Sequence, residues 1–333
     1  MTETADPTPR NERRVARPVL LAVLAAAWAV LYGCVQTYWR LTGPSEMSPV
    51  GEDLIAFAGW PVVGLCAAAA VLALAVLRAG SGPLVRNGLL LAVAGVSGAL
   101  LVAAAPLVLD VVGGLLPGLG IGVYPLGMLS RVGCVAVAVL LAAAADRYRR
   151  LSSPWCTACG RSAAVARMRE VTPYWAYAAA YLAVAGWLAR VLAQIRVGMD
   201  NTPFAAGVSM LLFEVGFVLA GLLLPLALVH SWGRVWPWWV PGLSGRRVPR
   251  WLVLGPAIGI SGGLLAYFGS GLVDMVYERL HGRAAFGQDG GLDLPAAFFW
   301  ISVPAYVLWG LGMAVAAYSY FHRTRMVCTA CGN

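Results

Sequence analysis

The chain has 333 residues, of which 60% are hydrophobic and only 12% are charged, with a formal net charge of +9. This composition lies far outside the usual balance of a soluble globular domain. The positive charge does not indicate nucleic-acid binding, because no recognisable reader motif accompanies it and most arginines stand in short segments between apolar runs. The composition therefore predicts a multi-pass membrane protein.

Eight apolar stretches are long enough to cross a bilayer. A hydrocarbon core of about 30 Å needs roughly 20 apolar residues per helix. Continuous runs rich in Ala, Leu and Gly favour helices over the alternating pattern of a transmembrane barrel. We therefore expect an all-α integral membrane protein with eight transmembrane helices and the lipid bilayer as its partner. The predicted helices, in chain order, cover residues 19–41, 53–77, 87–111, 122–145, 174–195, 205–230, 251–277 and 296–320.

The arginines predict the orientation in the membrane. They cluster before the first predicted helix, after each even-numbered one, and only sparsely elsewhere; the chain contains no lysine. By the positive-inside rule the arginine-rich segments are cytoplasmic, which places both termini in the cytoplasm and the protein in the cell membrane. Alternatively, the first apolar run could be a signal peptide cleaved near Ala25-Ala26-Ala27, but it is longer than the roughly 7 to 15 residues of a signal core.

Parts of the chain recur at constant separations. Residues 95–101 read GVSGALL and residues 259–265 read GISGGLL, 164 positions later. Beyond a longer loop in the second half the separation becomes 172 positions, which relates Tyr148 to Tyr320. A duplication of four helices explains both separations. The same two separations relate Arg86 to Arg250, Asp110 to Asp274 and Cys156 to Cys328.

The duplication predicts the domain organisation. An even number of helices per repeat makes the two repeats parallel, related by an axis along the membrane normal. Equivalent positions in the two repeats then lie on the same face of the membrane. The predicted segments are a disordered cytoplasmic tail at 1–17, a first four-helix repeat at 18–160, a cytoplasmic linker at 161–172 and a second four-helix repeat at 173–333.

Each repeat ends in the same pentapeptide, Cys-Thr-Ala-Cys-Gly. A C-x2-C pair followed by glycine has the spacing of a zinc knuckle, in which two thiolates of a tight turn bind one metal. Two such pairs on one face can complete a tetrahedral shell, which predicts a structural zinc; thiolates also accept iron, but nothing in the sequence suggests an electron-transfer partner. The expected metal ligands are Cys156, Cys159, Cys328 and Cys331.

Two other uses of these cysteines stay open. The metal could be shared between the subunits of a homodimer, or the pairs could be dithiol switches of a membrane thiol oxidoreductase or of a metal or redox sensor. A reducing cytoplasm disfavours persistent disulfides, and the interior Thr-Ala lacks the proline of many redox turns. The other cysteines, Cys34, Cys66 and Cys134, lie within apolar runs and are expected to be small buried side chains.

Charged residues inside the predicted spans are the candidates for a solute pathway. A charge in hydrocarbon is costly, so it is expected to face a bundle interior or a water-filled cavity. Glu214, Arg131 and Arg190 lie well inside spans, whereas Asp110 and Asp274 lie near the outer ends of related helices. A structural ion pair between Glu214 and Arg131, and aspartates that merely reach the interface, are the alternatives.

The first predicted helix ends in the cluster Tyr32, Gln36, Tyr38 and Trp39. With the composition, this cluster resembles multi-pass membrane proteins of high-GC actinobacteria, a resemblance that implies no activity. The sequence contains no H-E-x-x-H, P-loop or G-x-S-x-G motif, so an enzyme is not indicated. We interpret the chain as a permease for an unidentified small solute or ion, or as a membrane scaffold.

Overall fold

The computed structural model describes residues 9–43, 60–78, 82–122, 124–152, 156, 171–198, 205–238, 240–283 and 294–325, with side chains from residue 19 onward. Within these ranges the chain is helical and contains no β-strand, only an isolated bridge between Val235 and Arg247. Eight helical spans are long and apolar enough to cross a membrane. The predicted all-α class and the eight spanning helices are confirmed.

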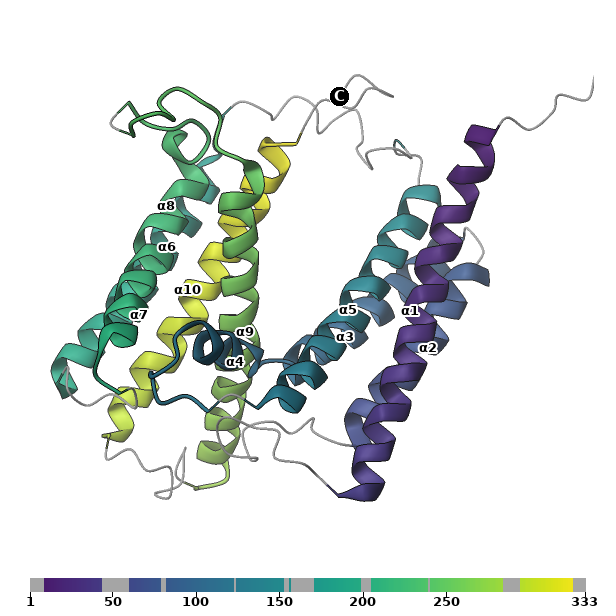
Figure 1. Cartoon of the computed structure of the whole chain (residues 1–333), viewed down its shortest axis with the longest axis horizontal. Helices are drawn as coiled ribbons and strands as arrows, with labels where there is room; N and C mark the ends of the chain where they lie inside the picture. The colour runs from purple at the N-terminus through teal and green to yellow at the C-terminus, as the bar shows by residue number, and fades with distance from the viewer. Residues whose placement is uncertain are drawn as a thin grey trace, which may run out of the picture. The chain divides into compact units, whose positions relative to one another are not determined.

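The helices form two compact units, and each is described by itself (Figure 1). The first unit contains α1 (Pro9–Thr42), α2 (Trp60–Arg78), α3 (Pro83–Ala103) and α5 (Pro125–Leu151). The second unit contains α4 (Leu107–Leu115), α6 (Tyr174–Val197), α7 (Val208–Val218), the π-helix η3 (Leu219–Leu223), α8 (Leu224–Val229), the short η4 (Ser231–Gly233), α9 (Arg250–Leu280) and α10 (Ala296–Arg323).

Among the described helices, the two largest differences from the predicted boundaries are at the start of α1 and at the end of α3. α1 begins at Pro9, so residues 9–17, predicted to be disordered, are helical; proline is favoured in the first turn, and the Arg, Glu and Ala that follow are good helix formers. α3 ends at Ala103 instead of continuing to residue 111. Pro106 lacks an N–H and disfavours a helical conformation in the preceding residue, so the chain turns and restarts as α4 in the second unit.

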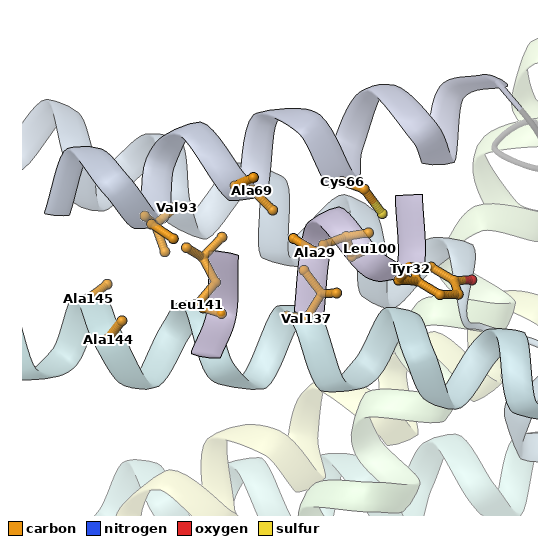
Figure 2. Packing of buried hydrophobic residues seen from close by; sticks show 14 of the residues in the cluster. Ala29, Tyr32, Cys66, Ala69, Val93, Leu100, Val137, Leu141, Ala144 and Ala145 are labelled. Carbon is orange, nitrogen blue, oxygen red and sulfur yellow. The ribbon is translucent and has the colours of Figure 1, made fainter. Parts of the chain in front are cut away.

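Small side chains form the core of the first unit. Ala29 and Tyr32 of α1 belong to one buried cluster with Val137 and Leu141 of α5 and with residues of α2 and α3 (Figure 2). Alanine lets helix backbones approach closely, which matters in lipid, where no hydrophobic drive holds helices together. Cys66 and Cys134 are buried as expected, but Cys34 is exposed on the outer face of α1.

In the second unit α6 and α10 cross with their backbones close together. A Cβ on Gly186 would lie 2.7 Å from the Ala305 carbonyl oxygen, and a Cβ on Gly312 would lie 2.5 Å from the Ala179 carbonyl oxygen. Only glycine permits this approach. The glycines of α9 differ: a Cβ on Gly259 would meet nothing within 4 Å, whereas a Cβ on Gly263 would lie 3.0 Å from the Val108 side chain.

The two units have the same order of helix packing. In the first unit α5 contacts α1, α2 and α3, while α2 also contacts α1 and α3. In the second unit α10 contacts α6, α8 and α9, while α8 also contacts α6 and α9. Like the second spanning helix, the fourth spanning helix of each unit thus packs against the other three. Its C-terminal end directly precedes the cysteine pair.

Candidate functional site

The helix ends that precede the two cysteine pairs are built alike. The Ser152 N–H and hydroxyl both donate to the Tyr148 carbonyl, at 2.9 and 2.8 Å. The Thr324 N–H and hydroxyl both donate to the Tyr320 carbonyl, at 3.0 and 2.7 Å. Ser152 and Thr324 are related by the 172-residue separation, and each stands four positions before the first cysteine of its pair. The chain therefore leaves α5 and α10 with the same local conformation.

A related arginine is bound to each of these helix ends. Arg86, at the start of α3, donates from Nη1 to the Ser152 carbonyl at 3.1 Å. Arg250, at the start of α9, donates from Nη2 to the Phe321 carbonyl at 3.1 Å. The last carbonyls of a helix have no partner within the helix and carry partial negative charge, so a guanidinium there satisfies both needs. Arg86 and Arg250 are also related by the 164-residue separation.

Further hydrogen bonds fix the end of α10 within the second unit. Arg323 donates from Nη2 to the Leu228 carbonyl at 2.7 Å and from Nη1 to the Thr172 hydroxyl at 2.8 Å. The Tyr320 hydroxyl donates to the Gly233 carbonyl at 2.9 Å. These bonds join the end of α10 to the end of α8 and to the segment before α6. The end of α10 is thereby fixed within the second unit.

Of the four predicted metal ligands, Cys156 is described and is partly exposed, while Cys159, Cys328 and Cys331 lie outside the described residues. In the part of the chain that the structure describes, no group of three or more His, Cys, Asp or Glu side chains is placed to hold a metal ion. His230, at the end of α8, contacts the rings of Tyr177 and Tyr181. The four-cysteine site therefore stays a prediction.

A closed polar network lies between α1 and α5, near the end of the first unit opposite its arginine-rich end. The Gln36 side-chain amide donates to the Tyr32 hydroxyl at 2.5 Å and to the Ser130 hydroxyl at 2.8 Å. The Tyr32 and Ser130 hydroxyls are 2.8 Å apart, and the Cys134 thiol is 3.2 Å from the Tyr32 hydroxyl. Arg131, a predicted pathway residue, is also buried here. Sequence spacing could have indicated the network, because Tyr32 and Gln36 lie one turn apart.

A second polar cluster occupies the corresponding region of the second unit, between α6 and α10. Arg190 donates from Nε to the Tyr306 hydroxyl at 3.0 Å and from Nη2 to the side-chain oxygen Oε1 of Gln194 at 2.9 Å. Its guanidinium also lies over the rings of Phe298 and Tyr306, at 5.0 and 5.4 Å from their centroids. Arg190 was predicted as a pathway residue, whereas Tyr306 was not recognised from the sequence.

The other predicted pathway residues differ in their exposure. Glu214 is exposed on α7, and Asp274 is exposed on α9. Asp110 is fully buried on α4 and is therefore not the counterpart of Asp274 at the end of an equivalent helix. Arg131 belongs to the first unit and Glu214 to the second. Among the described residues Arg190, Glu214 and Asp274 form no ion pair with one another.

The fold and these clusters define a helical multi-pass membrane protein with an arginine in a spanning helix of each unit. Comparisons with models of protein families, with curated proteins and with solved structures found no match to this chain. The resemblance to actinobacterial membrane proteins therefore stays a prediction.

Proposed function

We propose that the protein is a permease for a small solute or ion, or a membrane scaffold, built from two parallel repeats that one structural zinc joins on the cytoplasmic side. The observation that carries this proposal is the likeness of the two helix ends. The same cap, the same tyrosine and a related arginine precede each Cys-Thr-Ala-Cys-Gly segment. Because the similarity of the two helix ends extends beyond the pentapeptide, it supports the proposal that both cysteine pairs bind the same metal ion.

The chemistry of the four cysteines favours one shared ion. Each pair supplies two thiolates, and four thiolates around Zn²⁺ satisfy its tetrahedral preference without water or substrate. Such a centre carries a net charge of about −2, because four thiolates outweigh the divalent ion. Basic side chains at both helix ends, including Arg86, Arg250 and Arg325, offset this charge.

Fixed attachment points strengthen the case for a structural site. Because Ser152 and Thr324 cap their helices, only four positions separate an ordered backbone from the first thiolate of each pair. Short connections lower the conformational entropy that metal binding must overcome. A site of this kind would hold the repeats together, while the arginines within the spans would face a solute pathway.

The decisive experiment combines metal analysis with thiol labelling of the purified full-length chain. We expect one zinc per chain, poor alkylation of the four knuckle cysteines, and loss of most zinc and of thermal stability when any one of them is replaced by serine. Cys34→Ser is the matched control, because Cys34 is exposed and outside both pairs. A wild-type protein that contains no metal and four alkylatable thiols would refute the zinc site and support the thiol-redox alternative.

Two further measurements separate the variants of this proposal. In one measurement, chains carrying Cys156→Ser are co-expressed with chains carrying Cys328→Ser. Bound metal is recovered only if cysteines from two chains form one site, so recovery would favour a homodimer. In the other measurement, a reporter that is active only in the cytoplasm is fused to the chain. It should be active when fused after Asn333 or within residues 152–166, and inactive when fused at Gly118. Activity at only one of the first two positions would contradict the even number of spans and the shared site.

A further inference from the structure

The 172-residue separation relates Ser130 of α5 to Ser302 of α10, but the hydroxyl groups of the two serines have different hydrogen bonding. Ser130 and Ser302 are both buried, at 9% and 3% exposure. The Ser130 hydroxyl is hydrogen-bonded to the side chains of Tyr32 and Gln36 of α1. The Ser302 hydroxyl has no hydrogen-bond partner among the described residues. A polar network that is complete in the first unit is therefore incomplete at the equivalent place of the second.

Ser302 lies on the face of α10 that the Arg190 guanidinium contacts. Phe298, Ser302 and Tyr306 are spaced by four residues on α10, so they lie in a row along one face of that helix. The Arg190 guanidinium contacts the rings at both ends of this row, at 5.0 Å from the Phe298 centroid and 5.4 Å from the Tyr306 centroid. The serine between them must then face the same guanidinium.

This cluster has an excess of donors and of positive charge. Arg190 carries a full charge and makes no ion pair with a described carboxylate; its described partners, the Tyr306 hydroxyl and the Gln194 side-chain oxygen, are neutral. Because the Tyr306 oxygen accepts from Arg190, its own hydrogen remains available for donation. Trp309, one turn further along α10, has a buried indole N–H without a described acceptor. Arg190 is a half-buried cation next to donors without described acceptors, an environment that favours an anion.

We propose that the second unit binds a small monovalent anion, a carboxylate or a halide, between Arg190, Ser302 and Tyr306. The bound anion would fill the place that the Tyr32 and Gln36 side chains fill in the first unit. Gln194 positions Arg190, because the Gln194 amide is itself held by the Gly198 carbonyl at 3.0 Å. Binding at this site does not depend on the cysteines, whereas transport of the anion would rest on the permease proposal.

Equilibrium binding of labelled acetate to the purified full-length protein, with chloride as competitor, tests this inference. We expect saturable binding of one acetate per chain at constant ionic strength. Arg190→Gln should weaken it by about tenfold or more, because it removes a charged donor. Arg196→Gln is the matched control: Arg196 is on the same helix but exposed at its end, and its replacement should leave the affinity unchanged. Equal losses in both variants would refute the site.

Milder variants keep the test decisive if Arg190→Gln fails to fold. Tyr306→Phe and Ser302→Ala each remove one hydroxyl donor and retain the size needed for packing, so each should weaken acetate binding by several-fold. Ser130→Ala, the equivalent change in the first unit, should leave acetate binding unchanged. Wild-type protein that binds no acetate would overturn the inference, as would binding that survives Tyr306→Phe and Ser302→Ala together. Zinc-free cysteine variants that still bind acetate would separate this site from the metal proposal.

Discussion

Replacement of Gly186 by alanine should destabilise the second unit by forcing α6 and α10 apart. The added Cβ would stand 2.7 Å from both the Ala305 carbonyl oxygen and the Trp309 amide nitrogen, and these are backbone atoms that cannot rotate away. Ordinary contact begins near 3.4 Å, so the helices must separate by at least about 0.7 Å. Overpacking of this kind costs about 1–3 kcal/mol.

A glycine-to-alanine replacement is expected to raise the stability where the added Cβ has space. A Cβ on Gly259, in the middle of α9, would meet nothing within 4 Å. Alanine there should stabilise the helix by up to about 1 kcal/mol, because it reduces the freedom of the unfolded backbone. Unfolding of the detergent-purified variants, followed by circular dichroism against temperature or denaturant, measures both effects. Equal shifts for Gly186→Ala and Gly259→Ala would refute the close approach of α6 and α10.

A double variant sharpens this test. Gly312→Ala, whose Cβ would be 2.5 Å from the Ala179 carbonyl oxygen, should also destabilise the α6–α10 pair. Once one methyl group has separated the helices, the second costs less, so the loss in Gly186→Ala/Gly312→Ala should be smaller than the sum of the single losses. Additive losses would mean that the two glycines act at independent places.

Three further predictions follow from described hydrogen bonds and exposure. Gln36→Leu should lower the free energy of unfolding by about 0.5–2 kcal/mol, because it removes the amide that donates to the hydroxyls of Tyr32 and Ser130. Arg323→Gln should lower the melting temperature by several degrees, since it breaks the bond to the Leu228 carbonyl and leaves the ends of α8 and α10 less firmly joined. Glu214→Gln should leave the folded yield unchanged, as this side chain is exposed and forms no ion pair with a described residue.

Matched variants control these three predictions. Thr37→Val removes a hydroxyl that bonds only to the Gly33 carbonyl of its own helix, so it should cost much less than Gln36→Leu. Arg279→Gln, at an exposed position near the end of α9, should not change the melting temperature as Arg323→Gln does. A large loss of yield in Glu214→Gln would instead make Glu214 a structural residue, and an unchanged yield with altered activity would support its place in a pathway.

Sequence reasoning succeeded where hydrophobic runs alone decide the structure. Each of the eight apolar stretches forms a helical span, because a helix satisfies all of its backbone hydrogen bonds internally and needs no partner to cross lipid. The break between α3 and α4 was missed, since Pro106 interrupts a run that is uniformly apolar on both sides. The π-helix at 219–223 was also missed. Within it, a Cβ on Gly221 would lie 2.0 Å from the ring of Trp187 on α6, a contact with another helix that the local sequence does not show.

The sequence by itself determined the class of the protein, its eight spans and the recurring elements Arg86/Arg250, Tyr148/Tyr320 and Cys156/Cys328. Only the tertiary structure decided which polar side chains meet. Nothing in the local sequence distinguishes Ser130, whose hydroxyl is fully engaged, from Ser302, whose hydroxyl is not. The difference arises because α1 presents Tyr32 and Gln36 to α5, whereas α6 presents Arg190 to α10. Contacts between helices that are distant in the chain depend on how the helices pack. The residue pattern of one helix therefore does not predict which side chains of a neighbouring helix it will meet.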